Sequence, residues 1–137
     1  MTQVINHHSA LIYAMVLMSA SDGEMSDAEM QTIGEVVRKF PVFHDFDHAR
    51  LAVVAEECGQ IMSESEGLPT VLGLIAEALS PPLRETAYAA AVEVATADEI
   101  LRQEELRILE LMRDYFEIDR LRAGAIEHSA RVRHRVV

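Results

Sequence analysis

The fold is decided by residues 14–40, AMVLMSASDGEMSDAEMQTIGEVVRKF, in which two helical patterns flank a short acidic break. Apolar residues recur at helical spacing on both sides of the break. Asp22-Gly23 ends the first pattern, because glycine tolerates the backbone conformation that closes a helix. Ser26 and Glu29 then match the Ser-x-x-Glu capping box, in which each side chain bonds the backbone amide of the other residue. The stretch therefore predicts a helical hairpin.

The same pattern recurs 76 residues later, in residues 90–116, AAVEVATADEILRQEELRILELMRDYF. Asp22 aligns with Asp98, and Glu29 aligns with Glu105. Apolar matches follow from a shared helical period, but core packing requires neither acidic match. We therefore predict an internal duplication, with pseudo-repeats at about 10–43 and 86–119. The two hairpins should be related by a pseudo-two-fold axis, with the middle helices filling the remaining space.

The rest of the chain also reads as helices, since strand signals are nearly absent. Proline, glycine and polar breaks divide it into helices expected at 2–21, 26–40, 45–63, 69–79, 81–96, 101–116 and 119–130, followed by a basic tail at 131–137. The first helix should bury one stripe, and the sixth should turn Leu106, Leu109, Met112 and Phe116 inward. The prediction is a single all-α domain over residues 1–137, a compact bundle of about seven helices.

Composition excludes several classes of protein. The 137 residues include 12 Lys+Arg and 23 Asp+Glu, which gives a formal net charge of −11. Half of the residues are hydrophobic, so the chain is not a disordered acidic tail. Such a charge disfavours nucleic acid as a partner. The longest apolar run, Ala10 to Met18, is shorter than the roughly 20 residues that cross a bilayer. We expect a cytoplasmic protein whose single cysteine, Cys58, is a buried small hydrophobe.

The acidic breaks form the candidate site. If the pseudo-symmetry brings them together, they pool five carboxylates, and like charges at close range recruit a cation. Carboxylate oxygens are the ligands that hard divalent metals prefer. The candidate metal ligands are Asp22, Glu24, Glu29, Asp98 and Glu105. The alternative is local: Asp22 makes an Asx-turn, and Glu29 only completes its capping box.

The residues Ala20-Ser21-Asp22-Gly23-Glu24, followed by Glu29 and the stripe Met30, Ile33 and Phe40, resemble the TerB-like family, which is associated with tellurite resistance. Ala97-Asp98 and Glu105 resemble the second such element of that family. The resemblance implies an all-helical, internally duplicated fold and a divalent-metal site on the five acids named above. It also implies a role in stress response or in membrane-associated assemblies, with no established catalysis.

The leading hypothesis is a non-enzymatic helical binding module that holds a divalent metal and acts through protein partners. The sequence does not identify the metal. One alternative is a metal-dependent hydrolase, which would need Arg102 or Arg107 to position its substrate. Another is a metal-free scaffold whose acidic face docks a basic partner.

A second metal hypothesis concerns His44 and His48. On a helix, the spacing i and i+4 would place both imidazoles on one face, as in zinc-binding helices. Asp45 or Asp47 acting as a helix cap explains the same stretch without a metal.

Overall fold

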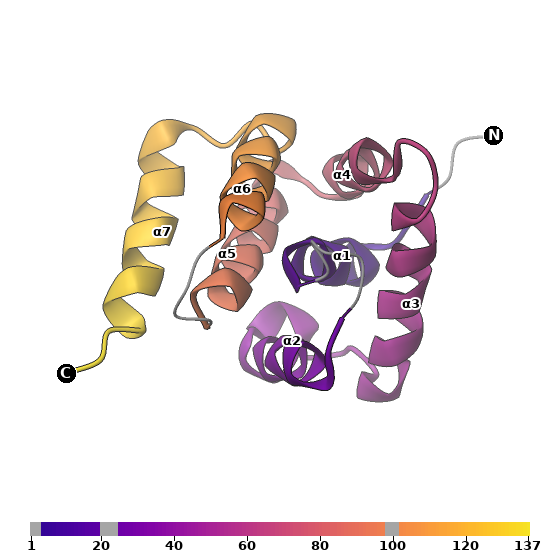
Figure 1. Cartoon of the computed structure of the whole chain (residues 1–137), viewed down its shortest axis with the longest axis horizontal. Helices are drawn as coiled ribbons and strands as arrows, with labels where there is room; N and C mark the ends of the chain where they lie inside the picture. Colours follow the sequence, from indigo (N-terminus) through magenta and orange to yellow (C-terminus); the bar gives the residue numbers. More distant parts are fainter. Residues whose placement is uncertain (1–3, 20–24, 98–101) are drawn as a thin grey trace.

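The computed structural model describes residues 4–19, 25–97 and 102–137. Within these ranges all regular structure is helical, so the predicted all-α fold is confirmed (Figure 1). The elements are α1 (His7–Ser19), α2 (Asp27–Lys39), the short 3-10 helices η1 (Pro41–Phe43) and η2 (His48–Arg50), α3 (Leu51–Met62), α4 (Gly67–Ala78), α5 (Pro81–Ala97), α6 (Gln103–Tyr115) and α7 (Arg120–Arg133).

Helix α1 is the centre of the bundle, with α2, α3, α4 and α5 packed around it (Figure 1). Every residue from Ser9 to Ser19 is buried. The predicted one-sided stripe is therefore wrong. The predicted start is also wrong, since α1 begins at His7 and Val4 is 83% exposed. The reason is the unbroken apolar run Ala10–Met18, because a helix that is hydrophobic all round must be covered on all sides.

Helices α2 and α6 occupy equivalent positions in the two hairpins. Their first residues, Asp27 and Gln103, and their last residues, Lys39 and Tyr115, both differ by 76. Each of these helices contacts both α1 and α5, and α1 also packs against α5. The hairpins thus share a register in three dimensions, and their origin by duplication stays a prediction.

Three predicted details differ from the structure. Leu106 is 45% exposed rather than inward-facing, and Glu105 and Ile108 are buried on α6 instead. Residues 45–50 do not begin an α-helix, because α3 starts only at Leu51. Helix α7 continues through Arg133, three residues past the predicted end, because Arg133 and His134 both pair with Glu93 of α5.

The single cysteine, Cys58, is buried as the sequence predicts. Cys58 is fully buried on α3, and burial raises the pKa of its thiol to about 12, which removes the thiolate needed for reactivity.

Among the described residues, no helix combines the length and the apolar character needed to cross a membrane.

Candidate functional site

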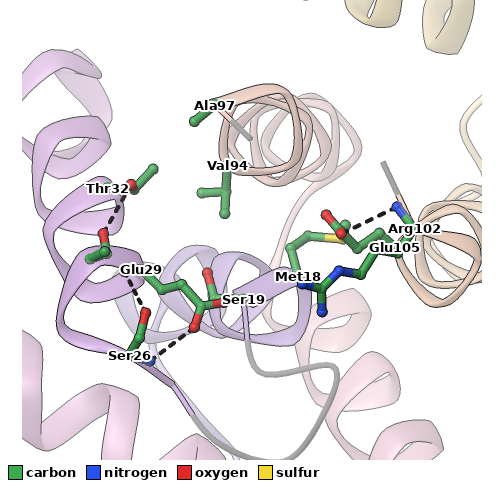
Figure 2. Close-up of a pocket in the computed structure, with 10 residues that line it drawn as sticks. Met18, Ser19, Ser26, Glu29, Thr32, Val94, Ala97, Arg102 and Glu105 are labelled. Atoms are coloured by element: carbon green, nitrogen blue, oxygen red, sulfur yellow. Dashed lines mark hydrogen bonds between the residues drawn. The ribbon is translucent and has the colours of Figure 1, made fainter. Parts of the chain in front are cut away.

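A pocket of about 460 Å³ opens where the ends of α1 and α5 meet the beginnings of α2 and α6 (Figure 2). Three pairs of residues that line it are separated by 76 positions, one member from each hairpin. These pairs are Met18 with Val94, Ser26 with Arg102, and Glu29 with Glu105. The pocket therefore lies at the junction of the two similar hairpins, which is where the acidic breaks were predicted to converge.

Glu29 reaches the pocket from the first turn of α2. The predicted capping box is confirmed: the Ser26 amide donates to Glu29 Oε1 at 2.9 Å, and the Glu29 amide donates to Ser26 Oγ at 3.1 Å. The box fixes the carboxylate at the start of the helix, where the positive end of the helix dipole stabilises an anion. Glu29 is half-buried there.

Glu105 holds the equivalent place on α6 and is 8% exposed. The Arg102 amide donates to Glu105 Oε1 at 3.4 Å, a longer bond than its counterpart at Glu29. Arg102 has no acceptor atom in its side chain and cannot return a hydrogen bond to the Glu105 amide. The second capping box therefore has only its carboxylate half.

Ser19, the last residue of α1, adds a buried hydroxyl to the pocket wall. It is 5% exposed, and its Oγ finds no hydrogen-bond partner in the part of the chain that the structure describes. Leaving a buried hydroxyl unpaired costs about 1–3 kcal/mol, so such groups in folded proteins call for an explanation. A hydroxyl in this position can serve as an oxygen ligand to whatever the pocket binds.

The five predicted site residues have different outcomes. The structure brings Glu29 and Glu105 to one pocket. Asp22, Glu24 and Asp98 lie outside the described residues. Within the described residues, no group of three or more His, Cys, Asp or Glu side chains could hold a metal ion. The described part of the pocket thus supplies two carboxylates and one hydroxyl.

Two pocket residues were absent from the predicted ligand set. Arg102 is signalled by the repeat alignment, since it stands where the first hairpin has the capping residue Ser26. Nothing in the sequence signals Ser19, because a serine at the end of an apolar helix is usually read as part of a break.

The zinc hypothesis for His44 and His48 is wrong in its geometry. His44 follows η1 and His48 begins η2, so no single helix carries both residues. The His44 ring bonds Pro41 O through Nδ1 at 3.2 Å, and Asp47 caps η2 by accepting from the Ala49 amide at 3.0 Å. The capping alternative explains this stretch.

A second polar cluster lies away from the pocket, where α7 packs on α5. Tyr88 is fully buried and donates to Glu127 Oε2 at 2.5 Å, while Arg113 donates to the Tyr88 hydroxyl at 2.9 Å. Burial is the main cause that raises the Tyr88 pKa, and the bond to Glu127 raises it further. These three side chains join α5, α6 and α7.

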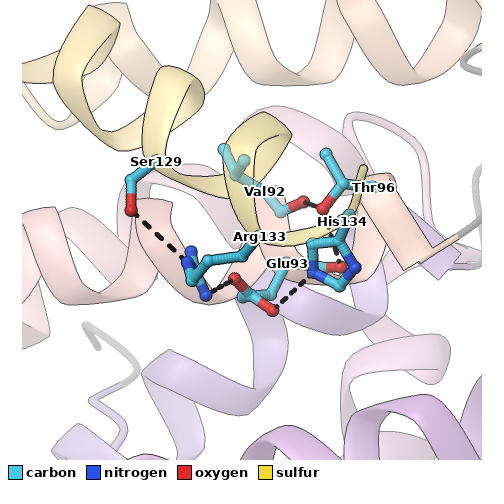
Figure 3. Close-up of polar contacts among 6 residues, drawn as sticks. All are labelled: Val92, Glu93, Thr96, Ser129, Arg133 and His134. Atoms are coloured by element: carbon cyan, nitrogen blue, oxygen red, sulfur yellow. Dashed lines mark hydrogen bonds and ion pairs between the residues drawn. The ribbon is translucent and has the colours of Figure 1, made fainter. Parts of the chain in front are cut away.

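Further along α5, Glu93 contacts the C-terminal end of α7 (Figure 3). Its carboxylate pairs with Arg133, and Glu93 Oε2 lies 3.0 Å from His134 Nε2. Glu93 is almost fully buried, so this pairing offsets the cost of taking a carboxylate out of water. Both polar clusters therefore hold α7 in place and are not candidates for the functional site.

A family model described as tellurite resistance protein TerB matches residues 8–128. No curated protein and no solved structure matches the chain significantly. The matched range includes both hairpins and all described residues that line the pocket.

Proposed function

The chain belongs to the TerB family of tellurite resistance proteins, and from that premise we propose that it is a non-enzymatic helical binding module whose pocket binds a divalent cation. The observation that carries the proposal is the meeting of Glu29 and Glu105 in one pocket, although 76 residues separate them in the chain. Core packing does not explain why two helices should direct carboxylates to the same place.

The residues present fit such an ion in their chemistry. Carboxylate and hydroxyl oxygens are ligands that Ca²⁺, Mg²⁺ and Mn²⁺ prefer. Glu29, Glu105 and Ser19 would hold the ion from the described side of the pocket. Asp22, Glu24 and Asp98, which follow α1 and α5 in the sequence, would complete the ligand set. When bound, the cation would neutralise carboxylates that otherwise repel one another.

We further propose that the module acts in the cytoplasm through protein partners, in a stress response. A net charge of −11 favours a partner with a basic surface, because complementary charge steers association. A peripheral membrane-associated assembly is compatible with the same role. No reaction is part of the proposal.

The metal-free scaffold is the second candidate, and one observation favours it. Both carboxylates already accept a backbone amide of their own helix start, Glu29 from Ser26 and Glu105 from Arg102. If capping is their whole purpose, the pocket needs no cation.

Calorimetric titration with Ca²⁺, Mg²⁺, Mn²⁺ and Zn²⁺ separates the two candidates. The double variant Glu29→Gln, Glu105→Gln keeps an oxygen that can cap each helix but removes both charges. We expect it to bind the preferred metal at least about tenfold more weakly, since a loss of 1.4 kcal/mol is tenfold.

The matched control is Glu35→Gln, Glu110→Gln, which removes two exposed charges from the same two helices outside the pocket. Its affinity should stay within about twofold, a difference well under 1.4 kcal/mol. Absence of heat with all four metals would reject the cation and leave the scaffold. Equal weakening by both double variants would show a general charge effect and no site.

A further inference from the structure

Helix α7 carries a second apolar stripe, on the face turned away from the bundle. Its inner face, where Ala123 and Ala130 are buried, packs on α5. Leu121, Ala125 and Val132 follow one another at helical spacing on the opposite face and form its outer stripe. Leu121 is 83% exposed and Val132 is 46% exposed, so no described element covers this stripe. Figure 1 shows α7 at one end of the long axis of the molecule, with no other described helix beyond it.

The segment that contains the outer stripe is basic, although the chain as a whole is acidic. Residues 120–137 contain five arginines and one acidic residue, whereas the whole chain has a net charge of −11. Arg120, Arg131 and Arg135 are exposed, and they make no ion pair with any residue that the structure describes. Helical spacing places Arg120 and Arg131 along one edge of the outer stripe. The outer face of α7 therefore combines apolar side chains with uncompensated positive charge.

Neighbouring carboxylates do not cancel this charge, because they already have basic partners. Asp119 Oδ2 lies 2.6 Å from Arg122 Nη1, and Glu127 Oε2 lies 3.2 Å from Arg113 Nη1. The carboxylate of Glu93 is likewise paired with the end of α7. Carboxylates at the opposite end of the molecule are screened by salt, whose screening length is about 8 Å at physiological ionic strength. The acidic remainder of the chain thus leaves the outer face of α7 positive.

An apolar stripe bordered by arginines is typical of a helix that lies in the plane of an anionic membrane. Each arginine near such a surface strengthens binding about fivefold, which corresponds to about 1 kcal/mol. A protein partner would need a surface that complements the stripe in shape. A bilayer needs no such match, because it is fluid and accommodates separate side chains such as Leu121 and Val132. Charge and shape together therefore favour a lipid surface.

We infer that the outer face of α7 is a docking surface for an anionic lipid bilayer. Leu121 and Val132 enter the membrane interface, while Arg120, Arg131 and Arg135 face the lipid phosphates. Arg131 and Arg135 lie beyond residues 8–128, so the match to the TerB family does not account for them. The inference goes beyond the proposed function, because this direct contact with lipid needs neither the cation nor a protein partner.

Sedimentation with lipid vesicles tests the inference, with a chelator present so that divalent ions cannot bridge lipid and protein. The unchanged chain should bind vesicles of equal parts phosphatidylglycerol and phosphatidylcholine at least about tenfold more tightly than vesicles of phosphatidylcholine alone, a difference of 1.4 kcal/mol. Added salt should weaken this binding, because salt screens the arginines. Equal binding to both kinds of vesicle, or binding to neither, would overturn the inference.

The triple variant Arg120→Gln, Arg131→Gln, Arg135→Gln removes the three unpaired charges. It should bind the anionic vesicles roughly a hundredfold more weakly, because three contributions of about fivefold multiply.

The matched control is Arg38→Gln, Lys39→Gln, Arg50→Gln, which removes three exposed charges outside α7 and changes the net charge equally. Its affinity for the anionic vesicles should stay within about twofold, since salt screens charges far from the contact. Equal weakening by the two triple variants would show a general charge effect and overturn the docking surface.

The double variant Leu121→Ser, Val132→Ser tests the apolar part of the surface. It should weaken binding about tenfold, equivalent to 1.4 kcal/mol of lost insertion, and leave the circular dichroism unchanged because both side chains are exposed. Val53→Ser, at an exposed valine of α3, should stay within about twofold, as a position outside the contact does. Unchanged binding by the double variant would overturn insertion into the bilayer.

A glutamate-rich helical peptide is the probe for the alternative occupant, an acidic protein. A chain that ignores both kinds of vesicle but binds this peptide through Arg120, Arg131 and Arg135 would overturn the bilayer as the occupant. The metal titrations separate this inference from the proposed function. Vesicle binding by a chain that binds no metal would reject the cation and retain the docking surface, and metal binding by a chain that binds no vesicle would do the reverse.

Discussion

The two hairpins share a register but differ in what their first helices bury. At positions 76 residues apart, α1 has Ile12 and Leu17 where α5 has Tyr88 and Glu93. All four residues are buried. The first hairpin therefore buries hydrocarbon at two places where the second hairpin buries a hydroxyl and a carboxylate.

The difference follows from the helices that cover each hairpin. Helices α3 and α4 pack on α1, whereas α7 packs on α5. Buried residues of α3 and α4 are almost all apolar, but α7 buries only two alanines completely. Because α7 offers so little apolar surface, its docking depends on Glu127, Arg133 and their partners. One backbone register can thus serve two kinds of interface, provided that each buried polar group meets a partner.

Placing a charged residue where the first hairpin buries an apolar one should cause the largest loss of stability. Leu17→Glu places a carboxylate at a fully buried position of α1, whereas the carboxylate of Glu93 on α5 is paired with Arg133. We expect it to cost about 3–5 kcal/mol or more, which is a large part of a domain's stability. Circular dichroism during urea denaturation would show little or no folded chain.

The reverse exchange, Glu93→Leu, serves as the comparison. Arg133 and His134 remain partly exposed and can return to water, so the variant should stay within about 1 kcal/mol of the unchanged chain. A loss as large as that of Leu17→Glu would show that the two interfaces do not differ in the way described.

A rise to alkaline pH should cause the next largest loss of stability. Burial, followed by the charge of Glu57, raises the pKa of Tyr13 from 10.0 to about 12. Between these values the unfolded chain loses the proton while the folded chain keeps it, so the free energy of unfolding should fall as pH rises from 10 to 12. Urea denaturation at a series of pH values would measure the slope.

Tyr13→Phe should make that decline shallower, since it removes one group that titrates differently in the two states. Tyr88 of the second hairpin would still contribute, because its pKa is also raised by burial and by Glu127. An unchanged slope in Tyr13→Phe would contradict the assignment.

Removing the side chain that caps a helix should cause the smallest loss of stability. Ser26→Ala removes the hydroxyl that accepts from the Glu29 amide, a change that typically costs about 1 kcal/mol. Ser65→Ala, in the exposed turn before α4, should stay within about 0.5 kcal/mol, as exposed positions usually do. Equal losses, measured by urea denaturation, would mean that the capping hydroxyl contributes nothing specific.

Much of the fold could be predicted because its signals are local. Ser26 and Glu29 mark the start of α2 to the residue, and Pro81 marks the start of α5. The unbroken apolar run Ala10–Met18 also indicates that α1 is buried on every side, which a prediction of a single stripe does not include. The end of α7 could not be predicted, since Arg133 and His134 are ordered by Glu93, which lies about 40 residues away in the chain.

Local signals likewise predict one part of the candidate site, and contacts between distant segments decide the other part. The two hairpins, their offset of 76 and the carboxylates Glu29 and Glu105 follow from local patterns, because caps and helical periods depend on near neighbours. The pocket that these carboxylates share with Ser19 and Arg102 is visible only in the folded chain. That meeting depends on how α1 and α5 pack against each other, and contacts between distant segments leave no periodic trace in a single sequence.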